Sequence, residues 1–200
     1  MLAGLILLGR FALELNHQQS ATQAQDRAWH DLVEAAAGPA TSPSGSPVPD
    51  VTPSPTDVLP GGIYLKLTID KLSETGVAIN SDWTGLKISS MVHYRDSPPP
   101  GGHGNVLLAF HREPHWLNIN QLAAGDVFHV ETVDRTVYTY QVDFAKVVSA
   151  TDVSLLRPTD GMDLTLITCD PPFRDYNRLY FRAHLVVPPA SPPAAASPSP

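Results

Sequence analysis

The chain has 200 residues, of which 42% are apolar and 16% are charged, and its formal net charge is −7. This length accommodates one ordinary domain with additional segments, and the apolar content is sufficient for a core. The acidic balance excludes a general nucleic-acid-binding protein, because such proteins need a basic surface that displaces counterions. The single cysteine, Cys169, excludes an internal disulfide bond and a zinc site built from several cysteines.

The N-terminal region, residues 1–38, combines a short apolar segment with a helical pattern. The uninterrupted apolar run ends at Gly9 and Arg10 follows it, whereas a membrane-spanning helix needs about 20 apolar residues. Two interpretations stay open: the outer half of a membrane anchor whose start lies upstream, or the apolar face of a soluble helix. Residues Phe11–Ala37 keep the helical pattern but become polar, and Gly38 ends it. We favour an anchor followed by a helical stalk.

Two proline-rich segments flank the part of the chain that has the composition of a folded domain. Seven prolines lie in residues 39–60 and six in residues 188–200, with many Ser, Thr and Ala residues among them. Proline removes backbone donors and favours extended chain, and the small residues around it bury little surface. We therefore predict a linker at 39–60, a folded domain at 61–187 and a disordered tail at 188–200.

Short apolar or alternating runs separated by turn residues predict strands along most of this domain. Many short strands indicate a closed or nearly closed β-barrel, so the predicted fold class is mainly β, with one or two short helices and a preceding N-terminal helix. One of these helices is expected at Leu117–Ala124. The predicted strands are Gly62–Asp70, Asn105–Phe110, Asp126–Val133, Thr136–Val148, Asp163–Cys169 and Arg178–Val187.

Two of these strands carry more specific expectations. Asn105–Phe110 is almost continuously apolar, which suits a strand buried on both faces. In the fourth strand, Tyr138, Tyr140, Val142 and Phe144 alternate with polar residues, so these four side chains are predicted to face the core.

Cys169 lies at the end of a predicted strand, directly before a chain segment that Pro171 forces out of the sheet. A lone cysteine is often a buried structural residue, but a strand end beside a loop is where reactive groups are commonly mounted. A nucleophilic cysteine acts as the thiolate and needs a nearby base or cation. Of the eight histidines, His111 stands out because it directly ends another buried strand.

Three segments of the domain carry a recognisable pattern. Thr165–Cys169 reads TLITC, Gly104–Arg112 reads GNVLLAFHR, and Asn177–Ala183 places an arginine at the start of the last strand. In this order they resemble the sortase family, whose hallmark is T-L-x-T-C after an upstream histidine segment and before an arginine-bearing strand. The resemblance covers essentially the whole of 61–187 and implies a sortase-like barrel.

The resemblance also implies the catalytic residues. Cys169 takes the place of the nucleophile, His111 that of the proton donor to the leaving amine, and Arg178 that of the group that stabilises the oxyanion. Arg178 follows the cysteine by nine positions. Arg174 and Arg182 are rivals, although Arg182 lies about 13 Å further along the strand at ~3.3 Å per residue. No metal or organic cofactor is implied.

The implied function is transpeptidation at the extracytoplasmic face of a bacterial cell membrane, with a single-pass N-terminal anchor. Sorting-signal-bearing secreted proteins (LPxTG- or LAxTG-like) would be substrates, and an amine of a cell-wall precursor or another protein would be the acceptor. No aspartate–proline–aromatic lid precedes the domain, which favours a housekeeping or class D–E type over a pilin polymerase. Phe110 stands where the family has glycine, and it favours one alternative, a catalytically impaired binding module; the other is a peptidase that hydrolyses its intermediate.

Overall fold

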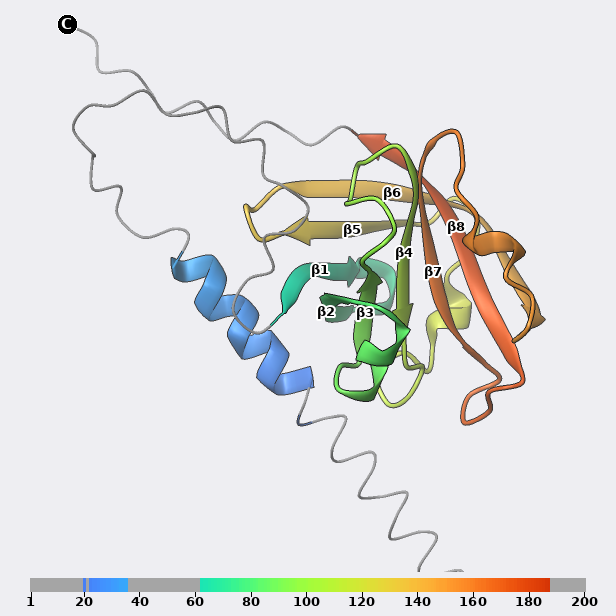
Figure 1. The fold of residues 1–200 in the computed structure, drawn as a ribbon, viewed down its shortest axis with the longest axis horizontal. Coiled ribbons are helices and arrows are strands. Elements are labelled where there is room, and N and C mark those ends of the chain that lie inside the picture. Colours follow the sequence, from blue (N-terminus) through green and yellow to red (C-terminus); the bar gives the residue numbers. More distant parts are fainter. Residues whose placement is uncertain (1–19, 21, 36–61, 188–200) are drawn as a thin grey trace, which may run out of the picture.

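The computed structural model describes residues 20, 22–35 and 62–187, which comprise one helix and eight strands. Of the predicted N-terminal region, 1–38, the apolar run at residues 1–9 lies outside the described residues, as do the linker at 39–60 and the tail at 188–200. In Figure 1 the helix, residues 22–35, lies against the outside of the strands on the side of β1. The strands are β1 (Ile63–Ile69), β2 (Glu74–Ser81), β3 (Met91–Tyr94), β4 (Gly104–Phe110), β5 (Val127–Thr132), β6 (Val137–Ser149), β7 (Met162–Asp170) and β8 (Asn177–Val187).

These strands form one closed barrel in the order β1-β2-β3-β4-β7-β8-β6-β5, and β5 pairs with β1 to close it. Two of the pairings, β2 with β3 and β4 with β7, are parallel. Because β4 and β7 run in the same direction, their C-terminal ends lie at the same end of the barrel (Figure 1). The predicted fold class, a mainly β closed barrel preceded by a helix, is confirmed.

The alternation of side chains along the strands builds the core. In β1, Leu65, Leu67 and Ile69 are fully buried, and the residues between them are partly exposed. Strand β4 differs, because all seven of its residues are buried. One face of β4 packs in the main core, and the other forms a second cluster outside it with residues such as Ile167 and Tyr180. The prediction that this strand is buried on both faces is therefore confirmed.

Strand β6 departs from the predicted alternation at its second half. Tyr140 and Val142 are buried and Tyr138 packs partly against the core, but Phe144 is 39% exposed. The pairing of β6 with β8 has a register irregularity between Val142 and Phe144. An extra residue at such a bulge shifts the following side chains to the other face. The prediction that Phe144 faces the core is therefore wrong.

Helical structure within residues 62–187 is limited to four short 3-10 helices. The helix predicted at Leu117–Ala124 is represented only by three of its residues. The four are η1 (Asp70–Leu72), η2 (Trp83–Lys87), η3 (Ile119–Gln121) and η4 (Ser154–Leu156).

The N-terminal helix docks on the barrel through a small apolar contact. Trp29 and Val33 are 2% and 6% exposed, and they form a cluster with Ile63 of β1 and Val77 of β2. They are four residues apart, so they lie on one face of the helix. Burying side chains of this kind contributes roughly 1.5–3 kcal/mol each. Among residues 20, 22–35 and 62–187, no helix is long and apolar enough to cross a membrane.

Candidate active site

The predicted nucleophile occupies the second-last position of β7. Cys169 is half-buried and is the free cysteine of the chain. Its direct cross-strand partner in β8 is Arg178. Directly opposed residues in an antiparallel pair have their side chains on the same face of the sheet. The antiparallel pairing of β7 with β8 therefore brings the cysteine and one of the three candidate arginines side by side.

The surroundings of Cys169 act on its thiol in opposite directions. Burial raises the pKa of the thiol above its ordinary value, and the positive charge of Arg178 is the largest influence that lowers it. Glu113 and Asp175 raise the pKa further, and Arg112 lowers it. Burial therefore disfavours the thiolate, and the nearby cations favour it.

Arg178 is anchored at one end of its guanidinium group. Its Nη1 donates hydrogen bonds to the carbonyl oxygens of Asp175 and Asn177 at 2.6 and 3.0 Å. Asp175 lies in the turn before β8 and Asn177 is the first residue of β8, so the two acceptors fix the side chain near the start of that strand. Within residues 62–187, its Nε and Nη2 donate to no partner, and both remain free to bind an incoming acceptor.

The other two candidate arginines lie elsewhere. Arg182 pairs with Thr165, four residues before Cys169 in β7, and its Nη2 donates to the carbonyl oxygen of Leu155 at 2.7 Å. Arg174 is exposed in the turn between β7 and β8. Of the three, Arg178 is the arginine that the sheet register places opposite the thiol.

His111 follows β4 directly, at the same end of the barrel as Cys169. The β4–β7 pairing extends to Ala109 and Ile167, so His111 and Cys169 each lie two positions beyond the last paired residues. The backbone N–H of His111 donates to the carbonyl oxygen of Ser90 at 3.0 Å. In the described part of the chain, its ring makes no hydrogen bond with the thiol.

The ring of His111 is instead held by η2. Its Nε2 lies 2.7 Å from the carbonyl oxygen of Leu86. A carbonyl oxygen only accepts hydrogen bonds, so Nε2 carries the proton and Nδ1 is the nitrogen that exchanges a proton in the neutral ring. This contact was not evident from the sequence, because Leu86 lies 25 positions before the histidine.

Phe110, where the sequence departs from the sortase pattern, points away from this site. It is 2% exposed and packs in the main core against Trp116, with ring centroids 5.0 Å apart. It does not line the neighbouring pocket. The bulky side chain therefore does not fill this pocket.

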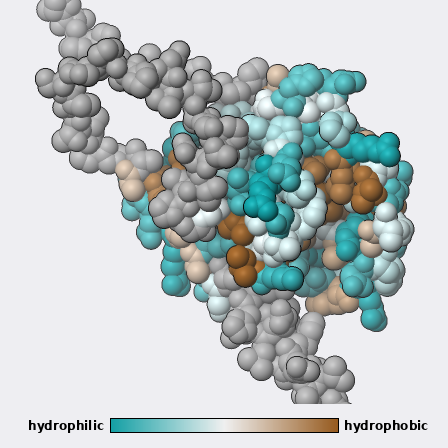
Figure 2. All heavy atoms as spheres, viewed as in Figure 1, coloured by the Kyte–Doolittle hydropathy of each residue, from teal (hydrophilic) through white to brown (hydrophobic). Residues whose placement is uncertain are grey.

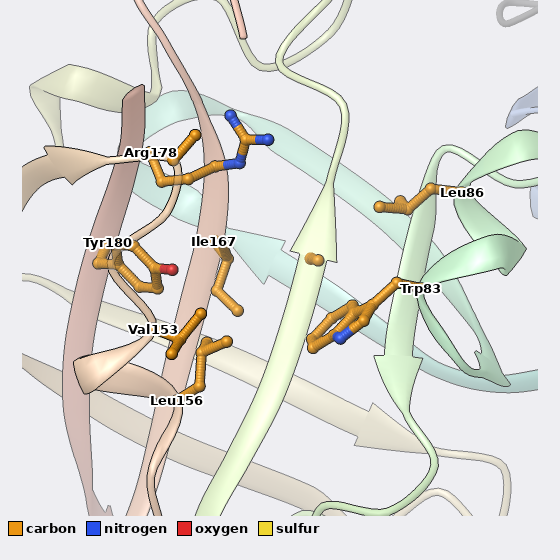
Figure 3. A pocket seen from close by; sticks show the side chains of 9 residues that line it. Trp83, Leu86, Val153, Leu156, Ile167, Arg178 and Tyr180 are labelled. Atoms are coloured by element: carbon orange, nitrogen blue, oxygen red, sulfur yellow. The ribbon is translucent and has the colours of Figure 1, made fainter. Parts of the chain in front are cut away.

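A pocket of about 260 Å³ extends from Arg178 across the outer faces of β7 and β4. Figure 3 shows Trp83 and Leu86 on one side of it and Val153, Leu156 and Tyr180 on the other. The space-filling view shows apolar side chains gathered in patches within a largely hydrophilic face (Figure 2). The complete lining is Trp83, Leu86, Ala109, Ala150, Val153, Leu156, Ile167, Arg178 and Tyr180.

The wall that carries Val153 and Leu156 is held in place by buried polar side chains. Asn105 is 2% exposed, and its amide donates to the carbonyl oxygens of Leu155 and Arg157 at 3.1 and 3.0 Å. Arg182 donates to the same Leu155 carbonyl. The loop between β6 and β7 thus presents its apolar residues to the pocket in a fixed arrangement.

The described residues contain no group of three His, Cys, Asp or Glu side chains that could hold a metal ion. The chemistry that the site offers is that of a thiol beside a guanidinium group, next to a mainly apolar pocket of about 260 Å³. This arrangement suits acyl transfer through a covalent thioester.

Comparisons with known proteins show which family this barrel resembles. The family model described as "Sortase domain" matches residues 67–186. The crystal structure of sortase C1 from Streptococcus agalactiae is similar, with 27% identity, a TM-score of 0.57 and coverage of 64% of this chain and 69% of that one. No curated protein matches.

Two further structures share the fold at lower identity. Sortase A from Listeria monocytogenes is 23% identical, with a TM-score of 0.56, over 63% of this chain and 88% of that one. A sortase D5 transpeptidase from Clostridium perfringens is 18% identical, with a TM-score of 0.59, over 86% of this chain and 99% of that one. Since the family model covers more than half of the 200 residues, the chain belongs to the sortase family.

Proposed function

We propose that this protein is a sortase-type cysteine transpeptidase that cleaves a C-terminal sorting signal and joins the acyl part to an amine. Membership of the sortase family supports a transpeptidase in general. The observation that carries the proposal for this chain is the direct cross-strand pairing of Cys169 with Arg178 beside an apolar pocket.

The proposed reaction has two covalent steps. The Cys169 thiolate attacks the carbonyl carbon of the threonine of the signal, so a C–S bond forms and the C–N bond from that carbon to the next residue breaks. His111 first takes the proton of the Cys169 thiol on Nδ1 and then delivers it to the departing amine, because Nε2 is bound to the Leu86 carbonyl. An acceptor amine then attacks the thioester, so a new C–N bond forms, the C–S bond breaks and Cys169 leaves as the thiolate; the amine loses a proton to His111, which can return it to the sulfur and restores the enzyme.

Arg178 supports both steps as a hydrogen-bond donor. Its Nη1 is bound to two backbone carbonyls, which orients the group, and its Nε and Nη2 donors serve the oxyanion of each tetrahedral intermediate. The same charge lowers the pKa of the Cys169 thiol against the effect of burial. A fixed cation that binds charge developing in the transition state stabilises it by roughly 3–4 kcal/mol.

The pocket fits the apolar part of a sorting signal. Its walls of Trp83, Leu86, Val153 and Leu156 suit the leucine and the proline or alanine of an LPxTG- or LAxTG-like segment. Arg178 at the other end of the lining then lies close to the scissile bond. In this placement the sorting signal lies along β4 and β7 and leads to Cys169.

The partners and location that we propose follow from this substrate. Sorting signals belong to secreted proteins, so the reaction takes place at the extracytoplasmic face of a bacterial cell membrane and anchors those proteins to the cell wall. The predicted segment at residues 1–38 would attach the barrel to that membrane. A housekeeping or class D–E role is proposed rather than pilin polymerisation.

Two alternatives are tested by product analysis. A catalytically impaired binding module is disfavoured, since Phe110 lies in the core and leaves the pocket free. A hydrolytic peptidase shares the thioester and differs only in the acceptor. The chain is incubated with LPxTG- and LAxTG-type peptides, with and without an amine such as triglycine. Formation of the peptide–amine product supports transpeptidation, whereas hydrolysis unchanged by the amine supports the peptidase.

A further inference from the structure

A buried ion pair connects the residues that directly follow the histidine and the cysteine. Arg112 Nη1 lies 2.5 Å from Asp170 Oδ1 and donates to the Cys169 carbonyl oxygen at 3.2 Å. The Arg112 side chain is 3% exposed, and that of Asp170 is 23% exposed. Arg112 does not line the pocket. The pair thus links two chain segments without facing the proposed substrate.

This link stands where the backbone pairing of β4 and β7 has ended. The last paired residues are Ala109 and Ile167. Beyond them, Thr168 Oγ1 donates to the Phe110 carbonyl oxygen at 2.9 Å, one residue before the cysteine and the histidine. Arg112 makes the corresponding link one residue after them. His111 and Cys169 are therefore enclosed by side-chain bridges on both sides.

The ion pair between Arg112 and Asp170 is not expected to contribute much to the stability of the fold. Removing two charges from water is costly, and replacing a buried ion pair by apolar side chains of similar size often leaves stability unchanged or increases it. An ion pair does, however, impose one geometry, because the guanidinium group must face its acceptors. The geometry it imposes here is the separation of the two proposed catalytic segments.

We propose that Arg112 is a positioning residue that, with Asp170, fixes His111 relative to Cys169. The inference rests on the proposed function for its catalytic consequence, since Arg112 itself contacts no reacting atom. The Asp170 carboxylate and the Cys169 carbonyl hold the guanidinium group, and the backbone from Arg112 to His111 transmits this constraint to the histidine.

The first test compares variants in the full chain. Arg112→Met/Asp170→Leu replaces the pair by apolar side chains, and we expect acylation of Cys169 by a sorting-signal peptide to slow about 100-fold, as for a small misplacement of a catalytic group. The KM for the peptide should stay within about twofold of its original value, because neither residue lines the pocket. Arg112→Lys, which retains the charge, should recover part of the rate. An unchanged acylation rate in the double variant would overturn the proposal.

The second test needs no peptide and uses the alkylation rate of Cys169 by iodoacetamide at neutral pH. In the original chain, His111→Ala should change this rate severalfold, and in the Arg112→Met/Asp170→Leu background it should have no further effect. A matched control is Arg182→Met/Asp163→Leu, which removes another partly buried Arg–Asp pair of β7 and β8. In this control background, His111→Ala should still change the alkylation rate of Cys169 severalfold.

The two tests separate this inference from the proposed function. If His111→Ala has the same effect in both backgrounds, or no effect in either, the positioning role is wrong, whatever the peptides do. If no peptide acylates Cys169 but the alkylation cycle shows the expected loss of coupling, the positioning role stands and the proposed reaction is wrong.

Discussion

Cys169 and Arg178 are direct partners across the β7–β8 ladder, which places a thiol and a guanidinium group on the same face at one end of the barrel. This relationship follows from the antiparallel hairpin alone, since the connecting turn fixes which residue of β8 lies opposite the cysteine.

Arg178→Ala should reduce the rate of Cys169 acylation by about 100- to 1,000-fold, the usual effect of removing one donor to an oxyanion. The side chain is only half-buried, so the variant should remain folded. Single-turnover kinetics with a sorting-signal peptide measures the rate. Arg174→Ala is the control, and a larger loss there than in Arg178→Ala would assign the role to Arg174.

The pH dependence of the thiol provides a second prediction. Burial raises the pKa of Cys169 and Arg178 opposes this effect, so the alkylation rate should increase with pH to a midpoint above that of an exposed cysteine. Arg178→Ala should move the midpoint to still higher pH. A midpoint that is the same with and without Arg178 would show that the guanidinium group does not act on the thiol.

A third prediction concerns the loop between β6 and β7. Asn105→Ala removes the amide that binds the carbonyls of Leu155 and Arg157, and it leaves the buried Thr165 hydroxyl without the Asn105 oxygen to which it donates; a buried group left without its partner costs about 1–3 kcal/mol. The melting temperature should fall and the KM for the peptide should rise, because Val153 and Leu156 lose their fixed position in the pocket wall. Calorimetry and steady-state kinetics measure the two effects. A rise in KM of the same size in Asp160→Ala, an exposed position of the same loop, would remove this explanation.

A fourth prediction concerns acid stability. Burial lowers the pKa of His93 to about 4, with its ring nitrogens 2.8 Å from Asn80 Oδ1 and 3.0 Å from the Pro98 carbonyl oxygen. A histidine whose folded pKa is depressed stabilises the fold above its unfolded pKa of about 6.5, and this contribution is lost as pH falls through about 4. The total is roughly 3 kcal/mol.

Urea unfolding at pH 7 and pH 4.5 measures this loss. In His93→Gln the decrease in the free energy of unfolding between the two pH values should be smaller than in the original chain. His103→Gln, at an exposed position, should behave as the original chain does. Equal decreases in all three proteins would show that His93 does not titrate on unfolding.

A fifth prediction concerns the N-terminal helix. Trp29→Ala removes the most buried side chain of its contact with β1 and β2, which should release the helix at a cost of up to about 3 kcal/mol. Hydrogen exchange of residues 22–35 should become fast while exchange in the barrel is retained. Glu34→Ala, on the exposed face, should leave the helix protected. Unchanged protection in Trp29→Ala would contradict the docked arrangement.

Much of the barrel could be predicted from local patterns, and the exceptions have physical reasons. Strand β4 was evident because its last five residues, Val106–Phe110, form a continuous apolar run. Strands β2 and β3 were not predicted. Strand β2 begins with the polar residues Glu74 and Thr75, which resemble a turn, and β3 has only four residues, which is too short for a clear pattern. The bulge that exposes Phe144 depends on pairing with a strand that follows much later in the chain.

The candidate site was also partly evident from local sequence patterns. Cys169 and His111 end strands whose sequences carry the family pattern, and Arg178 has the spacing of a short hairpin. Arg112 is the last residue of the histidine segment Gly104–Arg112, but its partner Asp170 lies 58 positions away. The ion pair is therefore evident only from the parallel pairing of β4 and β7. Trp83 and Leu86 belong to η2, and their place in the pocket depends on the closed barrel.

Mass spectrometry of the intact chain after incubation with LPxTG- and LAxTG-type peptides is the most direct test of the central proposal. We predict a mass increase equal to the acyl part of one peptide, located on Cys169, absent from Cys169→Ala and discharged by an added amine. Cleavage of the peptides by Cys169→Ala at the original rate, or no adduct with any peptide although the thiol is freely alkylated, would contradict it.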